Sequence, residues 1–82
     1  MDKRTPFAQW LRKTRKSKNL TLAEVGERAG HEGAYISTHE QATSRRPRLE
    51  TVDKLAKALA FDAREEVMFV KEARLACGYT GL

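Results

Sequence analysis

The segment from Thr21 to Gln41 constrains the fold most, because it has the pattern of two short helices joined at Gly30. Thr21 and Glu24 have the spacing of a capping box, in which each side chain bonds to the other residue's backbone N–H. Apolar residues follow at helical spacing up to Ala29, and the glycine after it favours the left-handed conformation that ends a helix. We therefore expect two helices that pack at a steep angle about a glycine turn.

Three further segments show helical periodicity, and no stretch shows the sustained alternation of a strand. A helix capped by Thr5 is predicted to fade near residues 17–19, and another begins near Leu49. The fifth runs from an acidic cap at Asp62 to Gly78. Because the connections are short, the sequence predicts an all-α bundle of five helices.

The positive charge is distributed unevenly along the chain. The net charge is +5, and residues 3–18 hold seven basic side chains with no acidic one. A second basic group, Arg45, Arg46 and Arg48, lies in the middle of the sequence. Two separate basic groups on a small protein favour a polyanionic partner, although solvated helix surface explains charge alone equally well.

The length of 82 residues predicts a single domain, residues 1–82, with a core over 5–60 and a fifth helix and short tail over 61–82. No apolar run approaches membrane-spanning length, and no signal peptide is visible at the N-terminus. Cys77 is the only cysteine, so it has no partner for an internal disulfide. These features favour a cytoplasmic protein.

Catalytic and metal chemistry find little support in the sequence. His31 and His39 are eight residues apart, which is not a metal-ligand spacing, and Cys77 is remote from both. No nucleophile arrangement and no glycine-rich phosphate loop is present. We expect no enzyme activity, no cofactor, no metal and no small-molecule ligand.

An ordered set of short matches resembles one known family, the phage-repressor or Xre-type helix-turn-helix DNA-binding domain. The matches lie within residues 7–60 and comprise Leu11-Arg12, Arg15, Leu20-Thr21, Ala29-Gly30, Tyr35-Ile36-Ser37, Glu40, Pro47-Arg48-Leu49-Glu50-Thr51-Val52 and Leu55-Ala56-Lys57-Ala58-Leu59. The resemblance implies a five-helix bundle of the lambda-repressor-like class. It also implies an ion pair between Arg15 and Glu40 that ties the first helix to the third.

The resemblance further implies which residues face DNA. They are Gly33, Ala34, Ser37, Thr38 and Gln41 on the third helix, and Arg45, Arg46 and Arg48 in the loop that follows. Thr21 either offers its hydroxyl and backbone N–H to a phosphate or only caps its helix, and these roles are compatible. Tyr35 is either a phosphate contact or a partly buried ring near the turn.

The clearest departure from the family is at Gly33 and Ala34, where members often carry polar side chains. Neither residue has a group that forms hydrogen bonds to a base. Three explanations remain open. Ala34 contacts a thymine methyl while Thr38 and Gln41 bond to bases, or DNA shape is read instead, or the helix serves a protein partner.

The function expected from the resemblance is sequence-specific regulation of transcription, more often repression, by a dimer on an inverted-repeat operator. The alternative is a protein-interaction module on the same fold, such as an antitoxin or an accessory subunit. The fifth helix is the expected dimer interface, because its apolar residues are too many for one inward face. Val67, Val70, Ala73 and Cys77 make one stripe, and Met68, Phe69, Leu75 and Ala76 fall largely outside it. The alternative is that Phe69 and Leu75 pack back on the first and fourth helices, which leaves a monomer that dimerises only on DNA.

Overall fold

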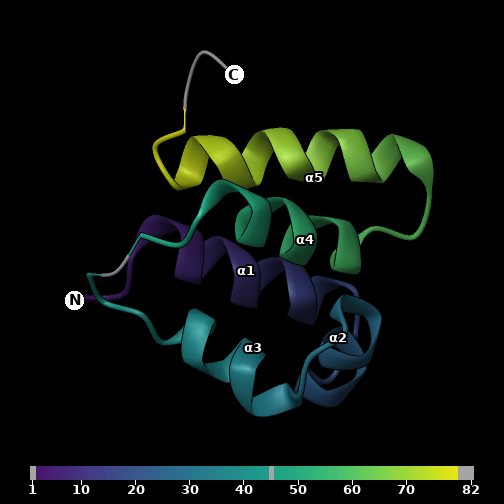
Figure 1. The fold of residues 1–82 in the computed structure, drawn as a ribbon, viewed down its shortest axis with the longest axis horizontal. Coiled ribbons are helices and arrows are strands. Elements are labelled where there is room, and N and C mark those ends of the chain that lie inside the picture. Colours follow the sequence, from purple (N-terminus) through teal and green to yellow (C-terminus); the bar gives the residue numbers. More distant parts are fainter. Residues whose placement is uncertain (1, 45, 80–82) are drawn as a thin grey trace.

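The structure is a computed structural model, which describes residues 2–44 and 46–79. These residues form five α-helices and no strand (Figure 1), which confirms the all-α class expected from the sequence. The helices are α1 (Pro6–Ser17), α2 (Leu22–Ala29), α3 (Gly33–Glu40), α4 (Leu49–Leu59) and α5 (Ala63–Ala76).

The helix ends lie where the local capping signals predict them. Thr5 accepts a hydrogen bond from the N–H of Ala8 at the start of α1, and Asp62 accepts one from Glu65 at the start of α5. The capping box at the start of α2 is formed in both directions, and Gly30 after it has a φ of 76°. Because such caps are satisfied within one turn of chain, they are readable without any tertiary information.

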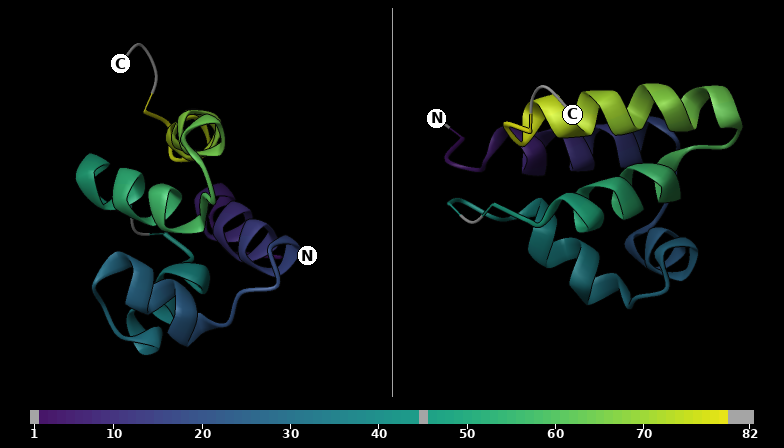
Figure 2. Two further views of the ribbon diagram at one scale, coloured as in Figure 1. Left: turned by 90° about the vertical axis from the view of Figure 1, so that its right-hand side faces the viewer. Right: turned by 45° about the horizontal axis from the view of Figure 1, so that its top comes forward.

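The helices lie in three layers, with α5 on one side, α1 and α4 in the middle, and α2 and α3 on the other side (Figure 2). Side chains from α1 to α4 meet in the middle. The largest fully buried ones are Phe7, Leu11, Val25, Ile36, Val52, Leu55 and Leu59. The core therefore fixes α2 and α3 against α1 and α4, while α5 covers the opposite face.

The division of apolar residues on α5 differs from the one expected. Phe69, predicted to lie in a dimer interface, is 7% exposed and packs edge-on against Trp10, with ring centroids 6.0 Å apart. Val67, which we placed on the same stripe as Ala73, is 73% exposed, whereas Ala73 is fully buried. The inner face of α5 is centred on Phe69 and Ala73, four residues apart, so Val67 is carried round to the solvent side.

Candidate nucleic-acid interface

The turn between α2 and α3 brings the two backbones unusually close together. A Cβ atom on Gly26 would lie 2.6 Å from the carbonyl oxygen of His31, and one on Gly33 would lie 3.1 Å from the backbone nitrogen of Ala23. The N–H of His31 also donates to the carbonyl of Gly26 at 2.7 Å, which closes the turn after the left-handed Gly30. The crossing of the two helices therefore depends on glycine at positions 26 and 33.

The resemblance implies that Gly33 faces outward, whereas in the structure it faces α2. Its missing side chain would point at the backbone of Leu22 and Ala23 in α2. The absence of a polar group at Gly33 thus has a packing cause, and only Ala34 of this pair is exposed. The sequence contained no local signal for this, because the constraint comes from another helix.

Arg15 of α1 and Glu40 of α3 form a bidentate ion pair that joins the two helices. The Arg15 Nε lies 2.6 Å from Glu40 Oε2, and the Nη2 lies 3.1 Å from Oε1. The Nη1 of Arg15 donates to the carbonyl of Leu20 at 2.9 Å. The two side chains are only 12% and 5% exposed, so this pair sets the orientation of α3 relative to α1.

The outer surface of α3 is formed by Ala34, Thr38 and Gln41, with Ser37 half-buried beside them. The Thr38 hydroxyl donates to the carbonyl of Ala34 at 3.0 Å, one turn earlier in the helix. The side-chain amide of Gln41 donates to the hydroxyl of Ser37, also at 3.0 Å. The side chains expected to read bases thus use some of their donors within the helix, Thr38 on a backbone carbonyl and Gln41 on the Ser37 hydroxyl.

Tyr35 lies between two histidines along the side of α3. Its ring stacks on His31 with centroids 3.9 Å apart, and His39 meets it edge-on at 4.7 Å. The Nζ of Lys54 lies 3.4 Å from the Nε2 of His31. Tyr35 is half-buried against the core, as the partly buried alternative in our sequence analysis describes.

Thr21 is occupied by its capping role. Its backbone N–H donates to the Glu24 carboxylate at 2.9 Å, and its hydroxyl oxygen accepts from the Glu24 N–H at 3.1 Å. Hydrogen bonding to the Glu24 carboxylate from the Thr21 backbone N–H first, and from the Thr21 side chain second, holds the pKa of Glu24 below its usual value. The Thr21 backbone N–H is therefore already used within the helix cap.

The basic loop after α3 is described only in part, because Arg45 lies outside the described residues. Arg48 is exposed at the start of α4, and its side chain makes no capping bond there. Arg46 is exposed too, but the carbon of its guanidinium lies 3.8 Å from the centre of the Tyr79 ring. Within this loop, Arg48 presents its charge to solvent while Arg46 stacks on the C-terminal segment.

Two basic residues that our site prediction omitted lie beside α3. Arg4 and Arg12 line an open hollow of about 520 Å³ together with Ser37 and Gln41 from the exposed side of α3. The run of basic residues over 3–18 pointed to this area, but the sequence did not show which of its members turn towards α3. Arg12 lies three residues before Arg15 on α1, which places it on the helix face that meets α3.

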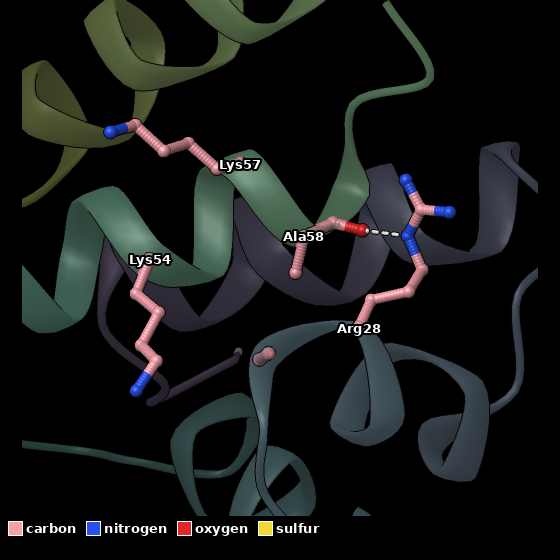
Figure 3. Close-up of a pocket in the computed structure, with 5 residues that line it drawn as sticks. Arg28, Lys54, Lys57 and Ala58 are labelled. Atoms are coloured by element: carbon pink, nitrogen blue, oxygen red, sulfur yellow. Dashed lines mark hydrogen bonds between the residues drawn. The ribbon is translucent and has the colours of Figure 1, made fainter.

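A second basic hollow of about 340 Å³ lies between α2 and α4, and Figure 3 shows the side chains around it. Arg28 donates to the carbonyl oxygens of Ala58 and Ala60 and so satisfies the C-terminal end of α4. Lys54 and Lys57 project from α4 in different directions (Figure 3). The Arg28 guanidinium therefore links α2 to the end of α4 by hydrogen bonds, whereas the two lysines are exposed at the surface.

The described residues offer little for other chemistry. Among residues 2–44 and 46–79, no group of three or more His, Cys, Asp or Glu side chains is arranged to hold a metal ion. Burial raises the pKa of the Cys77 thiol, which keeps it protonated at neutral pH. None of the described helices is both long enough and apolar enough to cross a membrane.

A short helix, a left-handed glycine turn and a second helix with an exposed face together define the helix-turn-helix class, whose known role is DNA binding. The model of one protein family, described as a helix-turn-helix domain, matches residues 6–67. This chain belongs to that family. No curated protein and no solved structure matches it.

Proposed function

We propose that this protein is a sequence-specific regulator of transcription of the phage-repressor type, which binds double-stranded DNA as a dimer and represses by occluding a promoter. The observation that carries the proposal is the hollow in which Arg12 stands beside Ser37 of α3 and Gln41 at its end, whereas Arg4 in the same hollow is paired with Asp2. Positive charge beside an exposed helix suits a major groove about 12 Å wide between two phosphate backbones.

Affinity in this proposal comes mainly from phosphate contacts, and sequence preference comes from a small part of α3. Arg12 and Arg48 supply cationic donors around that helix. Ala34 offers a methyl group suited to the methyl of thymine, and Thr38 and Gln41 retain acceptor atoms for base edges. The small exposed side chains favour close approach of the helix to the groove floor.

The alternative function is a protein-interaction module, and one observation favours it. The donors of Thr38 and Gln41 already bond within α3, so fewer groups are ready to read bases. The two functions differ in how binding responds to salt. A DNA-binding protein loses affinity for random-sequence duplexes steeply between about 50 and 200 mM salt, because each phosphate contact releases counterions.

The test of the proposed function is therefore the salt dependence of binding to random-sequence duplex DNA, followed by selection of bound duplexes from a random pool. We expect a steep negative slope of log affinity against log salt, and enrichment of an inverted repeat in the selected pool. A flat slope with no enriched sequence would leave the interaction module as the function of this fold.

Arg48→Ala tests the loop within this proposal. We expect it to weaken binding to all duplexes and to reduce the magnitude of the salt slope by about 0.9, which corresponds to one phosphate contact. Lys71→Ala is the matched control, because it removes the same charge from an exposed position on α5. Equal slopes for wild type and Arg48→Ala would show that Arg48 makes no phosphate contact.

The proposed dimer forms through α5, now with Met68 and Leu75 as its apolar contacts in place of the buried Phe69. Met68 is 47% exposed and Leu75 is 57% exposed, and they lie seven residues apart on one side of the helix. Exposed apolar area on so small a protein is a frequent partner site.

Met68→Glu is expected to convert a dimeric wild type into a monomer in sedimentation at micromolar concentration, because it places a carboxylate in an apolar contact. Met68→Leu, which keeps the side chain apolar and of similar volume, should leave the dimer intact. If the wild type and both variants sediment as the same species, α5 is not the interface.

A further inference from the structure

The chain turns back on itself after α5. Gly78 has a φ of 81°. The N–H of Tyr79 donates to the carbonyl of Arg74 at 2.8 Å, and the N–H of Gly78 donates to the carbonyl of Leu75 at 3.1 Å. This pair of hydrogen bonds around a left-handed glycine is a Schellman cap, which fixes the direction in which the chain leaves the helix. Here it directs Tyr79 onto the segment between α3 and α4.

Tyr79 makes two contacts with that segment. Its hydroxyl donates to the carbonyl oxygen of Pro47 at 2.7 Å, and its ring lies under the guanidinium of Arg46 at 3.8 Å. Both contacts join residues more than 30 positions apart in the chain. Tyr79 also lies beyond residues 6–67, which the family model matches.

The base of this arrangement is anchored to α4. Arg74, whose carbonyl receives the Tyr79 N–H, forms a two-pronged ion pair with Asp53 at 2.8 and 2.7 Å. Hydrogen bonding from Arg74 holds the pKa of Asp53 below its usual value, which keeps the pair charged at neutral pH. The end of α5 that carries Tyr79 is therefore held against α4 by this ion pair.

Stacking has a specific effect on what Arg46 can bind. A guanidinium that lies flat on an aromatic ring uses its face, and its N–H donors remain at the edge of the plane. Arg46 is exposed, and its guanidinium also interacts with the thiol of Cys77, so part of its edge is used within the protein and its other donors are left for solvent. Restricting this long side chain before binding removes part of the entropy that it otherwise loses when it meets an oxyanion.

We propose that Tyr79 is a positioning residue for DNA-phosphate contact: its ring holds the guanidinium of Arg46 in place for a phosphate, and its hydrogen bond to the Pro47 carbonyl anchors that ring. The inference rests on the proposed DNA-binding function and deepens it. In this proposal, the segment that follows α5 helps to set the geometry of the phosphate contacts.

The test compares Tyr79→Leu, Tyr79→Phe, Arg46→Ala and the double variant Tyr79→Leu/Arg46→Ala for binding to random-sequence duplex DNA. We expect Tyr79→Leu to weaken binding about three- to tenfold, the range for losing the preorganisation of one flexible side chain. Tyr79→Phe keeps the ring under Arg46 and should weaken binding less. The double variant should bind no more weakly than Arg46→Ala, because Tyr79 acts through Arg46.

The outcomes separate cleanly. If the wild type binds DNA with a steep salt slope and Tyr79→Leu keeps its affinity and slope, the inference is overturned while the proposed function stands. Tighter binding by Tyr79→Leu, or effects that simply add in the double variant, would also overturn it, since Tyr79 would then restrain Arg46 or act independently. A wild type without salt-dependent binding overturns the proposed function itself, and the inference with it. Circular dichroism melts of each variant identify any loss that comes from unfolding.

Discussion

Glu40→Ala lowers the free energy of unfolding by about 3–5 kcal/mol, the range for removing one partner of a buried ion pair. The variant leaves the Arg15 guanidinium largely buried, with the Leu20 carbonyl as its remaining partner. A protein of this size has a total stability of about 4–12 kcal/mol, so at the lower end of that range a large part of the population should unfold at 37 °C. Urea denaturation followed by circular dichroism measures the change.

The double variant Arg15→Leu/Glu40→Leu is the control for this prediction. Replacing both charges by apolar side chains leaves no uncompensated charge, so it should cost clearly less than Glu40→Ala alone. A loss below about 1 kcal/mol for Glu40→Ala, the usual value for an exposed pair, would show that water reaches this site in solution.

Gly26→Ala should destabilise the protein by about 3 kcal/mol, towards the upper end of the range for overpacking. Helix propensity alone predicts the opposite sign, a gain of about 0.5–1 kcal/mol for replacing a glycine inside a helix. The added methyl group meets backbone atoms of His31, Glu32 and Gly33, which cannot rotate out of the way as a side chain would.

The sign of the change therefore decides this prediction, and thermal or urea unfolding measures it. Glu27→Ala, at the next and exposed position of α2, is the control and should change stability by less than about 0.5 kcal/mol. A stabilised Gly26→Ala protein would mean that α2 and α3 are further apart than the structure has them.

The helices themselves were predictable because their signals are local. Thr5, Thr21, Gly30 and Asp62 each act within one turn of the chain, and the sequence shows them directly. The inner face of α5 was not predictable in the same way. Apolar residues occur around much of that helix, and packing against α4 and α1, including the Trp10 ring, selects Phe69 for the interior.

Contacts within the candidate site could be predicted only where the family resemblance implied which residues meet in the folded chain. The pairing of Arg15 with Glu40 came from that resemblance, since 25 residues separate them in the chain. The packing role of Gly33, the hydrogen bond from Gln41 to Ser37 and the stacking of Arg46 all depend on contacts between elements or along one helix. Periodicity and composition carry no information about such contacts.

The three-layer arrangement has a consequence for how proteins of this architecture diversify. Helices α1 and α4 separate α5 from α3, so substitutions on the outer side of α5 leave the geometry of α3 untouched (Figure 2). Under the proposed dimerisation through α5 and base reading by α3, subunit pairing and base preference would then be free to drift independently over evolutionary time. A lineage would acquire a new half-site spacing by altering residues such as Met68 and Leu75 while it kept the half-site itself. Tyr79 is the exception, because a change there alters both the end of α5 and the loop beside α3.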